Sequence, residues 1–242
     1  MALIELRDVS KSFEDNHVLR SVDLDIEKGT TVVILGKSGV GKSVLLKVLV
    51  GLIVPDSGSV RIDGREVIGM KHRELIDLRK SMGYLFQSAA LYDSMTVRDN
   101  LAFPLARHEN LDADELETRI ANQLRLVGLV DAIDKMPSEL SGGMKKRIGL
   151  ARAMITNPQI MLYDEPTTGL DPITSREISC LIKSLQERYQ PTSLAVTHDM
   201  QCARIIANAA AILHDGRLNL RGTLDSLERS DDPTVKSFFA TE

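Results

Sequence analysis

Residues 31–50 read TVVILGKSGVGKSVLLKVLV, and this stretch decides the fold. Its first five residues form a continuous, β-branched apolar run, which is typical of a strand buried on both faces. The next eight fit the pattern G-x-x-x-x-G-K-[ST], and a helix-like stretch follows over residues 43–50. A strand, a glycine-rich turn and a helix in this order predict a loop that binds phosphate groups.

Each residue type in this loop has a physical purpose. Glycines let the backbone curl so that successive N–H groups point at phosphate oxygens, and the following helix adds the positive end of its dipole. We expect Lys42 to reach the β- and γ-phosphates of ATP and the Ser43 hydroxyl to ligate Mg²⁺. The residues predicted to bind the nucleotide are Gly36, Lys37, Ser38, Gly39, Val40, Gly41, Lys42 and Ser43. A glycine-rich turn with a solvated lysine is the alternative, but it leaves the flanking strand and helix unexplained.

A second apolar run, over residues 160–163, ends in two adjacent carboxylates, Asp164 and Glu165. Strands of an α/β sheet present polar groups to a ligand at their carboxyl ends. Consecutive strand side chains point in opposite directions, so the two acids are expected to have different roles. We expect Asp164 to face Mg²⁺ and Glu165 to hold and polarise the attacking water. A solvated acidic turn is the alternative, and the phosphate loop upstream makes it the weaker one.

Strands and helices alternate at both ends of the chain, and the middle is helical. Two β-rich runs, residues 3–9 and 18–26, precede the phosphate loop, whereas residues 97–156 show helical periodicity and no convincing strand. After Pro158 strands and helices alternate again. This order predicts a mostly parallel sheet covered on both faces, with a helical insert that forms a second lobe.

Charge and hydropathy limit the class of protein. The net charge of −4 argues against nucleic acid as the main ligand, since proteins that bind its phosphate backbone usually carry a basic face. No apolar run approaches the roughly 18 to 20 residues that cross a bilayer, and the first residues lack the features of a signal peptide. We therefore expect a cytoplasmic protein that meets a membrane only through a partner. Its two cysteines, Cys180 and Cys202, lack metal-ligand spacing, and we expect both to be buried, reduced thiols.

A second glycine pair occurs in residues 140–147, which read LSGGMKKR. A hydroxyl, free glycine amides and a helix N-terminus form another arrangement that binds anions. The alternative is a simple helix N-cap with Ser141 as the capping residue. Because the chain already has one phosphate loop, a second phosphate-binding segment suggests a nucleotide shared between two copies.

Taken together, these motifs resemble those of the ABC (ATP-binding cassette) ATPases, and the resemblance covers essentially the whole chain. Residues 140–144 look like the family's signature motif. The other family motifs appear in order: Phe13 resembles the aromatic that stacks on adenine, Gln87 the Q-loop glutamine, Gly169-Leu170-Asp171 the D-loop and His198 the switch histidine. Two positions depart slightly, because Phe13 replaces the commoner tyrosine and Gly169 stands where many members carry alanine or serine.

The resemblance implies a fold and an activity. The fold is α/β, with a P-loop NTPase (RecA-like) core of mostly parallel sheet, an N-terminal antiparallel β subdomain and an inserted α-helical subdomain. The implied boundaries are 1–87 and 157–230 for the catalytic core, 88–156 for the helical subdomain and 231–242 for a C-terminal tail. The implied activity is hydrolysis of ATP to ADP and phosphate with Mg²⁺, coupled to transport.

The resemblance also implies a role for each motif residue. The catalytic residues are Glu165, His198, Lys42 and Gln87, and the metal ligands are Ser43, Gln87 and Asp164. Outside the phosphate loop, the nucleotide contacts are Phe13, Gln87, Ser141, Gly142, Gly143, Met144, Asp171 and His198. Two copies are expected to face each other head to tail with ATP bound. Each ATP then lies between residues 36–43 of one copy and 141–144 of the other.

A narrower resemblance concerns the partners. Residues 85–92, 136–144 and 232–239 are similar to segments of the ATPases of Mla and Mce-associated lipid transporters. This similarity implies phospholipid transport through a separate MlaE-like permease, with a small STAS-domain subunit and an MCE-domain protein as further partners. It places the chain on the cytoplasmic face of the inner membrane.

Two competing functions stay open. The first is a soluble ABC ATPase without a transporter, such as those of iron–sulfur assembly, translation or chromosome maintenance. Long coiled coils or a second cassette, which mark some of those proteins, do not occur in this sequence. The second is a regulatory module that binds nucleotide without hydrolysing it, but such a module would be expected to lack Glu165 or His198.

Overall fold

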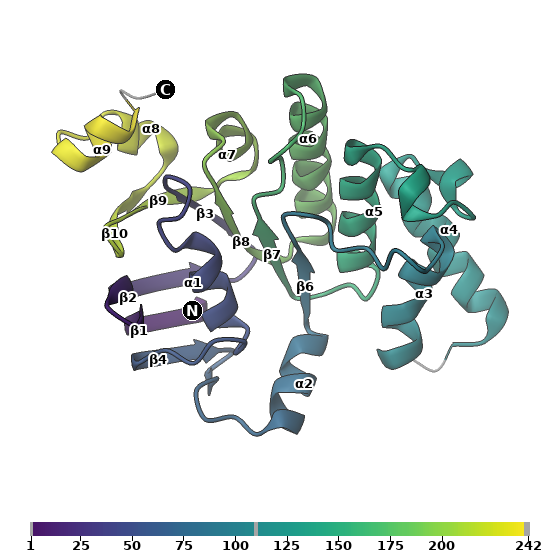
Figure 1. Cartoon of the computed structure of the whole chain (residues 1–242), viewed down its shortest axis with the longest axis horizontal. Coiled ribbons are helices and arrows are strands. Elements are labelled where there is room, and N and C mark those ends of the chain that lie inside the picture. Colours follow the sequence, from purple (N-terminus) through teal and green to yellow (C-terminus); the bar gives the residue numbers. More distant parts are fainter. Residues whose placement is uncertain (1, 109–110, 240–242) are drawn as a thin grey trace.

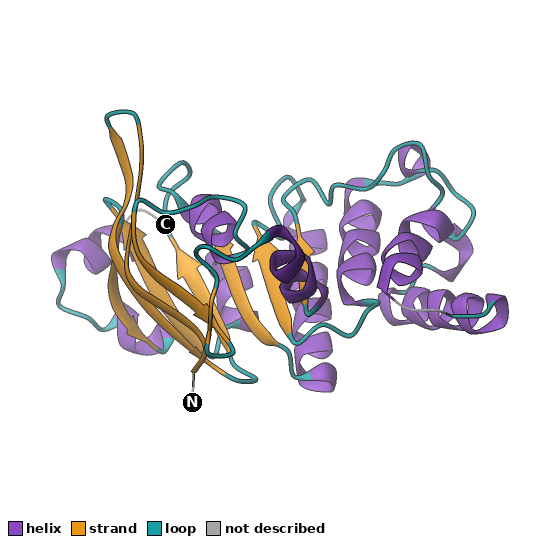
Figure 2. Cartoon of the chain, turned by 90° about the horizontal axis from the view of Figure 1, so that it is seen from below, coloured by secondary structure: helices purple, strands orange, loops and turns teal. Residues whose placement is uncertain are grey.

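The computed structural model describes residues 2–108 and 111–239. Within them the strands form two sheets. The first sheet is antiparallel, in the order β2-β1-β4-β5. It contains β1 (Ala2–Phe13), β2 (Asn16–Glu27), β4 (Ser57–Ile62) and β5 (Arg65–Glu66). This sheet lies against one side of the central sheet (Figures 1 and 2).

The central sheet has the order β10-β9-β3-β8-β7-β6 and is parallel except for β10. Its strands are β3 (Thr31–Leu35), β6 (Met82–Leu85), β7 (Ile160–Asp164), β8 (Thr192–Thr197), β9 (Ala209–His214) and β10 (Arg217–Gly222). Strands β3, β7 and β8 are buried along their whole length, which explains their unbroken apolar runs. Because these strands are parallel, the loops that follow them meet at one edge of the sheet.

Helices cover the central sheet and build the second lobe. The described helices are α1 (Lys42–Leu49), α2 (His72–Lys80), α3 (Val97–His108), α4 (Ala113–Val127), α5 (Gly142–Met154), α6 (Pro172–Tyr189), α7 (Met200–Ile206), α8 (Leu224–Glu228) and α9 (Pro233–Phe239). Helices α3 and α4 stand apart from the sheet beyond β6, with α5 between them and α6 (Figure 1). The predicted α/β fold with a mostly parallel sheet is confirmed.

Alternation along β3 divides the core into two layers. Val32 and Ile34 face α1 and the antiparallel sheet, whereas Val33 and Leu35 face α6 and α7. A third cluster joins α3, α4 and α5 and includes Leu101, Ile120, Leu124 and Ile148. The helical lobe therefore has an apolar cluster of its own, and α5 joins it to the core by packing Leu150 and Met154 into the second layer. The boundaries 1–87, 88–156, 157–230 and 231–242 stay a prediction, and residues 1, 109–110 and 240–242 lie outside the described part.

The two cysteines differ in exposure. Cys202 on α7 is buried, but Cys180 on α6 is exposed, so the expectation that both are buried is wrong for Cys180. The reason is helical geometry, because Cys180 lies two positions from both Ile178 and Ile182, which are buried. Two positions along a helix correspond to roughly half a turn, which places Cys180 on the opposite face.

Native-state labelling is expected to separate the two thiols. Burial raises the pKa of the Cys202 thiol to about 12, so little of the reactive thiolate exists at neutral pH. A maleimide should therefore modify one cysteine per folded chain, Cys180, and both cysteines in denaturant. Intact-mass and peptide mass spectrometry would show this, with Cys180→Ser as the control. Labelling of Cys202 as fast as Cys180 in the folded chain would contradict the described packing of α7.

Candidate nucleotide-binding site

The phosphate loop joins β3 to α1 through a turn that requires glycine. Gly41 has φ 108°, and a Cβ there would lie 2.6 Å from the Val18 side chain of β2. Helix α1 begins at Lys42, immediately after Gly41, and no side chain caps its first turn, which also carries no acidic residue. Its N-terminal N–H groups and the positive end of its dipole are therefore left for an anion.

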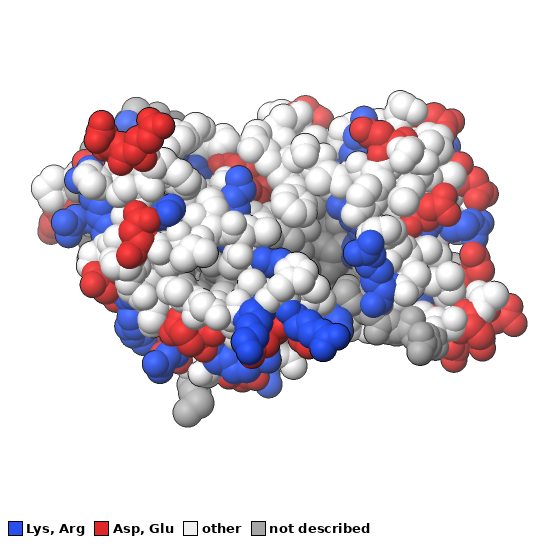
Figure 3. All heavy atoms as spheres, turned by 60° about the horizontal axis from the view of Figure 1, so that its bottom comes forward, with Lys and Arg blue, Asp and Glu red and all other residues white. Residues whose placement is uncertain are grey.

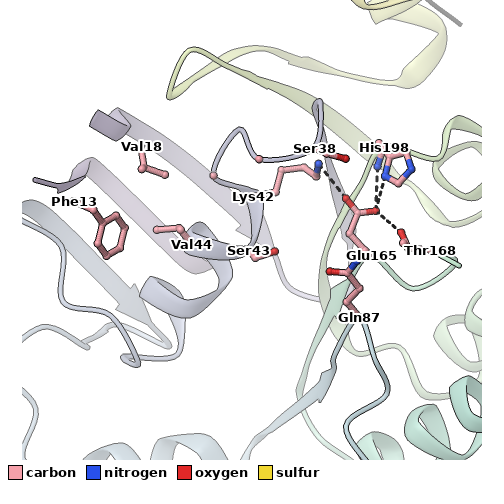
Figure 4. Close-up of a pocket in the computed structure, with 12 residues that line it drawn as sticks. Phe13, Val18, Ser38, Lys42, Ser43, Val44, Gln87, Glu165, Thr168 and His198 are labelled. Carbon is pink, nitrogen blue, oxygen red and sulfur yellow. Dashed lines mark hydrogen bonds and ion pairs between the residues drawn. The ribbon is translucent and has the colours of Figure 1, made fainter. Parts of the chain in front are cut away.

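Lys42 is a buried cation at the centre of the site, with 5% of its surface exposed. Its Nζ donates to the carbonyl oxygens of Gly36 at 2.7 Å and Lys37 at 3.1 Å, and pairs with Glu165 Oε1 at 3.0 Å. The other oxygen of Glu165 accepts from Thr168 Oγ1 at 3.1 Å and lies 2.9 Å from His198 Nδ1 (Figure 4). The loop, β7 and β8 thus bring a lysine, a carboxylate and an imidazole together.

Asp164 points away from this group, as strand alternation predicts. Its Oδ1 accepts from the Ser43 hydroxyl at 2.8 Å, and its Oδ2 accepts from the Tyr84 hydroxyl at 3.2 Å. Burial and the Asp164 carboxylate raise the pKa of Tyr84 well above its ordinary value, so Tyr84 remains a donor.

The Ser43–Asp164 pair fits Mg²⁺ carried on phosphates. A hydroxyl and a carboxylate oxygen are hard donors of the kind this ion prefers. Among residues 2–108 and 111–239, no group of three His, Cys, Asp or Glu side chains could hold a metal by itself. Mg²⁺ is usually held by one or two protein ligands together with substrate phosphates and water, so such a sparse protein donor set is suitable.

The cleft above these residues has a volume of about 320 Å³ and has chemically different ends. Phe13 and Val44 lie at one end, and Glu165 and His198 at the other (Figure 4). Phe13 is 45% exposed, and Lys11 Nζ lies 5.4 Å from the centre of its ring. An aromatic face at one end and a buried lysine at the other suit a molecule that combines a base with a phosphate chain.

The ABC transporter family model matches residues 19–168. The chain belongs to the ABC transporter family. It is an ATP-binding subunit of that family and an ATPase, as predicted.

Three similar proteins illustrate the relationship. The "probable ribonucleotide transport ATP-binding protein mkl" of Mycobacterium leprae is 42% identical over 97% of this chain and 68% of its own length. The "intermembrane phospholipid transport system ATP-binding protein MlaF" of Haemophilus influenzae is 39% identical over 99% of this chain and 91% of its own. The dimeric, post-hydrolysis structure of the ATP-binding cassette MJ0796 with ADP and Pi has a TM-score of 0.84 and 32% identity, over 91% of this chain and 98% of its own.

The ABC motifs divide into two groups in space. The motif residues that line the cleft are Phe13, Ser38, Gly39, Gly41, Lys42, Ser43, Gln87, Glu165 and His198. Asp164 lies beneath the cleft, against Ser43. Of the remaining loop residues, Lys37 and Val40 line a neighbouring hollow with Leu213, and Gly36 supplies the carbonyl oxygen that binds Lys42.

The signature and D-loop residues lie elsewhere in the chain. The cleft is not lined by the signature residues Ser141, Gly142, Gly143 and Met144 or by Asp171 of the D-loop. Ser141 caps α5 by accepting from the Met144 amide at 3.3 Å, and Asp171 caps α6. A Cβ on Gly143 would lie 2.6 Å from Thr174 Cγ2, so the first turns of α5 and α6 are packed together. The two motifs therefore form one surface, separate from the cleft of their own chain.

Sequence reasoning missed three polar contacts of the site. Thr168 donates to Glu165, Tyr84 donates to Asp164, and Lys146 donates through Nζ to the Glu165 carbonyl at 3.0 Å. Tyr84 stands three residues before Gln87, in a stretch read only for its glutamine. Lys146 stands just after the signature motif, where a lysine reads as part of a solvated helix. Only the folded chain brings these side chains to the two acids.

Proposed function

We propose that this chain is the ATPase that powers phospholipid transport through a separate permease. The observation that carries this proposal is the near end-to-end similarity to MlaF, which covers 99% of this chain and 91% of that protein. The mkl protein, named for ribonucleotide transport, is slightly more similar in sequence, but this chain spans only 68% of its length. Ribonucleotides are therefore the second candidate cargo.

We further propose that two copies share two ATP molecules. The surface formed by Ser141 and Asp171 lies outside its own cleft, so it is available to a second copy. The dimeric structure of the similar cassette MJ0796 supports this arrangement. Each ATP would lie between residues 36–43 and Phe13 of one copy and residues 141–144 of the other. The signature hydroxyl, glycine amides and α5 N-terminus would then meet the phosphates from the opposite side.

Hydrolysis would begin with a change of partner at Lys42. When phosphates enter, Lys42 can exchange its Glu165 contact for the β- and γ-phosphates. Glu165 is then free to accept a proton from the attacking water, while His198 and Thr168 continue to hold its other oxygen. Ser43, Asp164 and Gln87 are the proposed Mg²⁺ residues, and bound Mg²⁺ would neutralise charge on the phosphate oxygens. His198, with nearly half of its side chain exposed, would contact the γ-phosphate.

Coupling to the permease would use a second cleft, of about 260 Å³, between the lobes. Its aromatic residues are Tyr84, Phe86, Tyr92 and Phe103, and its cations include Arg107. Figure 3 shows lysine and arginine side chains beside the hollow that separates the two lobes. Tyr84 and Phe86 stack at 4.1 Å in this cleft, and the next residue, Gln87, lines the nucleotide cleft, so one short segment connects the two clefts. A segment docked there could sense ATP through these residues.

The proposed partners follow the lipid-transport assignment. They are an MlaE-like permease, a small STAS-domain subunit and an MCE-domain protein. The structure has no helix, within its described residues, that is long and apolar enough to span a bilayer. We therefore propose that the chain reaches the cytoplasmic face of the inner membrane through the permease.

Reconstitution would test the cargo. We expect the complex of this chain with its permease to release phosphate faster in phospholipid vesicles than in detergent, and to move a fluorescent phospholipid only when ATP can be hydrolysed. A complex built with Glu165→Gln is the control for coupled transport. Transport of radiolabelled ribonucleotides, with no effect of phospholipid, would replace the lipid assignment with the second candidate. A chain that never co-purifies with a membrane protein would favour a soluble ABC ATPase.

A further inference from the structure

Lys146 is a buried cation that the mechanism above does not use. It lies on α5, five residues after Ser141, and only 4% of its surface is exposed. Its Nζ donates to the main-chain carbonyl of Glu165 at 3.0 Å. The Glu165 carboxylate has a different cation, Lys42, at 3.0 Å. Two lysines from different elements therefore hold Glu165, one through its side chain and one through its main chain.

The stability of the helix does not explain a charged residue at this place. Burial lowers the pKa of Lys146 to about 8, although Asp164 and Glu165 partly oppose the shift. A shift in this direction means that the folded chain disfavours the ammonium form relative to water. An apolar side chain of similar length would avoid the cost of burying an ammonium group. What the lysine supplies, and an apolar residue lacks, is the hydrogen bond to Glu165.

The main chain of Glu165 is in a conformation that needs support. Its φ is 47°, in the left-handed region that residues with a Cβ rarely adopt. Its N–H donates to the Val196 carbonyl at 2.9 Å, and its own carbonyl accepts from Lys146 Nζ at 3.0 Å and, less closely, from the Thr168 amide at 3.3 Å. These contacts do not involve the carboxylate, so they persist when ATP takes Lys42 away from it. The Lys146 bond then becomes the link between Glu165 and the helical lobe.

We propose that Lys146 is a positioning residue that ties the main chain of Glu165 to α5 and so orients the general base. The proposal rests on the proposed function, in which Glu165 is that base and residues 141–144 at the start of α5 bind the partner's ATP. Because α5 carries both the signature residues and Lys146, a shift of the helix on ATP is passed to Glu165 of the same chain. Closure around the ATP of one site would thereby orient Glu165, the general base of the other site.

Two uncharged substitutions separate this role from a structural one. Lys146→Gln keeps an N–H donor on a side chain that is one bond shorter, whereas Lys146→Met has a similar length and no N–H donor. Since a displacement of about 1 Å can slow a reaction roughly a hundredfold, Lys146→Met is expected to lower kcat by about ten- to a hundredfold. Its KM for ATP should stay within about twofold, because ATP binding is untouched. Lys146→Gln should keep kcat within about threefold of wild type.

Thermal unfolding provides a readout besides activity. In Lys146→Met, the lost hydrogen bond to the Glu165 carbonyl and the relief from burying an ammonium group act in opposite directions, so its Tm should stay close to that of wild type despite its slow turnover. A lower Tm together with a higher KM would instead indicate damage to packing and overturn the proposal. If Lys146→Met does not fold, Lys146→Leu provides the same comparison.

ATP-dependent dimerisation distinguishes failure of this inference from failure of the proposed function. Glu165→Gln and the double variant Lys146→Met/Glu165→Gln should form the ATP-bound dimer equally well in size-exclusion chromatography. If neither variant dimerises, the shared-site function is wrong, and the positioning role of Lys146 loses its basis. If both dimerise but the single variant Lys146→Met turns over ATP like wild type, only the positioning role is wrong. Equal loss of kcat in Lys146→Gln and Lys146→Met would also overturn the positioning role, because the hydrogen bond would not explain the effect.

Discussion

Replacing Glu165 by glutamine is expected to lower steady-state ATP turnover about a thousandfold without weakening ATP binding. General-base catalysis typically contributes about 10²- to 10⁴-fold, and an amide cannot accept the proton of the attacking water. The substitution preserves size in a site where Glu165 is only 7% exposed, so the fold should survive. Release of phosphate from ATP, measured at saturating Mg-ATP, checks the loss.

The same substitution is expected to tighten ATP binding and trap the dimer. Glu165 now holds Lys42 at 3.0 Å, and its negative charge opposes incoming phosphates. A neutral glutamine removes that competition, so the affinity for ATP should rise. Without hydrolysis to reopen it, the ATP-bound pair should accumulate in size-exclusion chromatography.

A matched substitution outside the site gives the control. Glu187 on α6 is 67% exposed at its side chain and pairs only loosely with Lys183, at 3.9 Å. Glu187→Gln should therefore turn over ATP at the wild-type rate and remain monomeric at the same protein concentration. A Glu165→Gln variant that stays monomeric at saturating ATP, or that hydrolyses it normally, would remove Glu165 from the proposed role.

The parts of the site that could be read from sequence are those built by neighbouring residues. The phosphate loop needs a buried strand, positive-φ glycines and a helix start, and residues 31–50 carry all three. The opposite orientations of Asp164 and Glu165 were predicted from strand alternation, although Glu165 lies just past the end of β7 and has φ 47°. Strand β3, predicted at residues 31–35, occupies those residues in the structure.

Several elements gave too weak a signal to be predicted. Helix α2 is nine residues long, and its apolar residues are Leu75, Ile76 and Leu78, of which only Leu78 is buried, so few positions reveal its helical period. Strand β6 is four residues long and contains Gly83, which reduces its strand propensity. Tyr84 and Lys146 were missed for a different reason. Their partners are 80 and 19 positions away, and no local pattern reports such contacts.

The second large effect is expected for Lys42→Ala, which should abolish productive ATP binding. Lys42 is 5% exposed, and its loss removes the positive charge from the place where the phosphates would lie. Truncating one partner of a buried, hydrogen-bonded charge pair in a binding site costs about 2–5 kcal/mol, and each 1.4 kcal/mol is about tenfold in affinity. ATP affinity should therefore fall by about thirtyfold to several thousandfold. Titration with a fluorescent ATP analogue measures this, and unchanged affinity and turnover would refute the phosphate-loop assignment.

Mixing Lys42→Ala with a second variant tests whether each site is built from two chains. Ser141 is exposed at the start of α5, away from its own cleft, so a Lys42→Ala chain still offers an intact signature segment to a partner. A Ser141→Arg chain likewise still offers an intact phosphate loop. Heterodimers of the two should contain one complete site and one doubly damaged site. The amount of ATP hydrolysed under single-turnover conditions should therefore exceed that of either variant alone. The steady-state rate need not recover, because a full cycle could require both sites. If mass spectrometry shows that subunits exchange and the mixture still performs no single turnover, a site built within one chain is the better account.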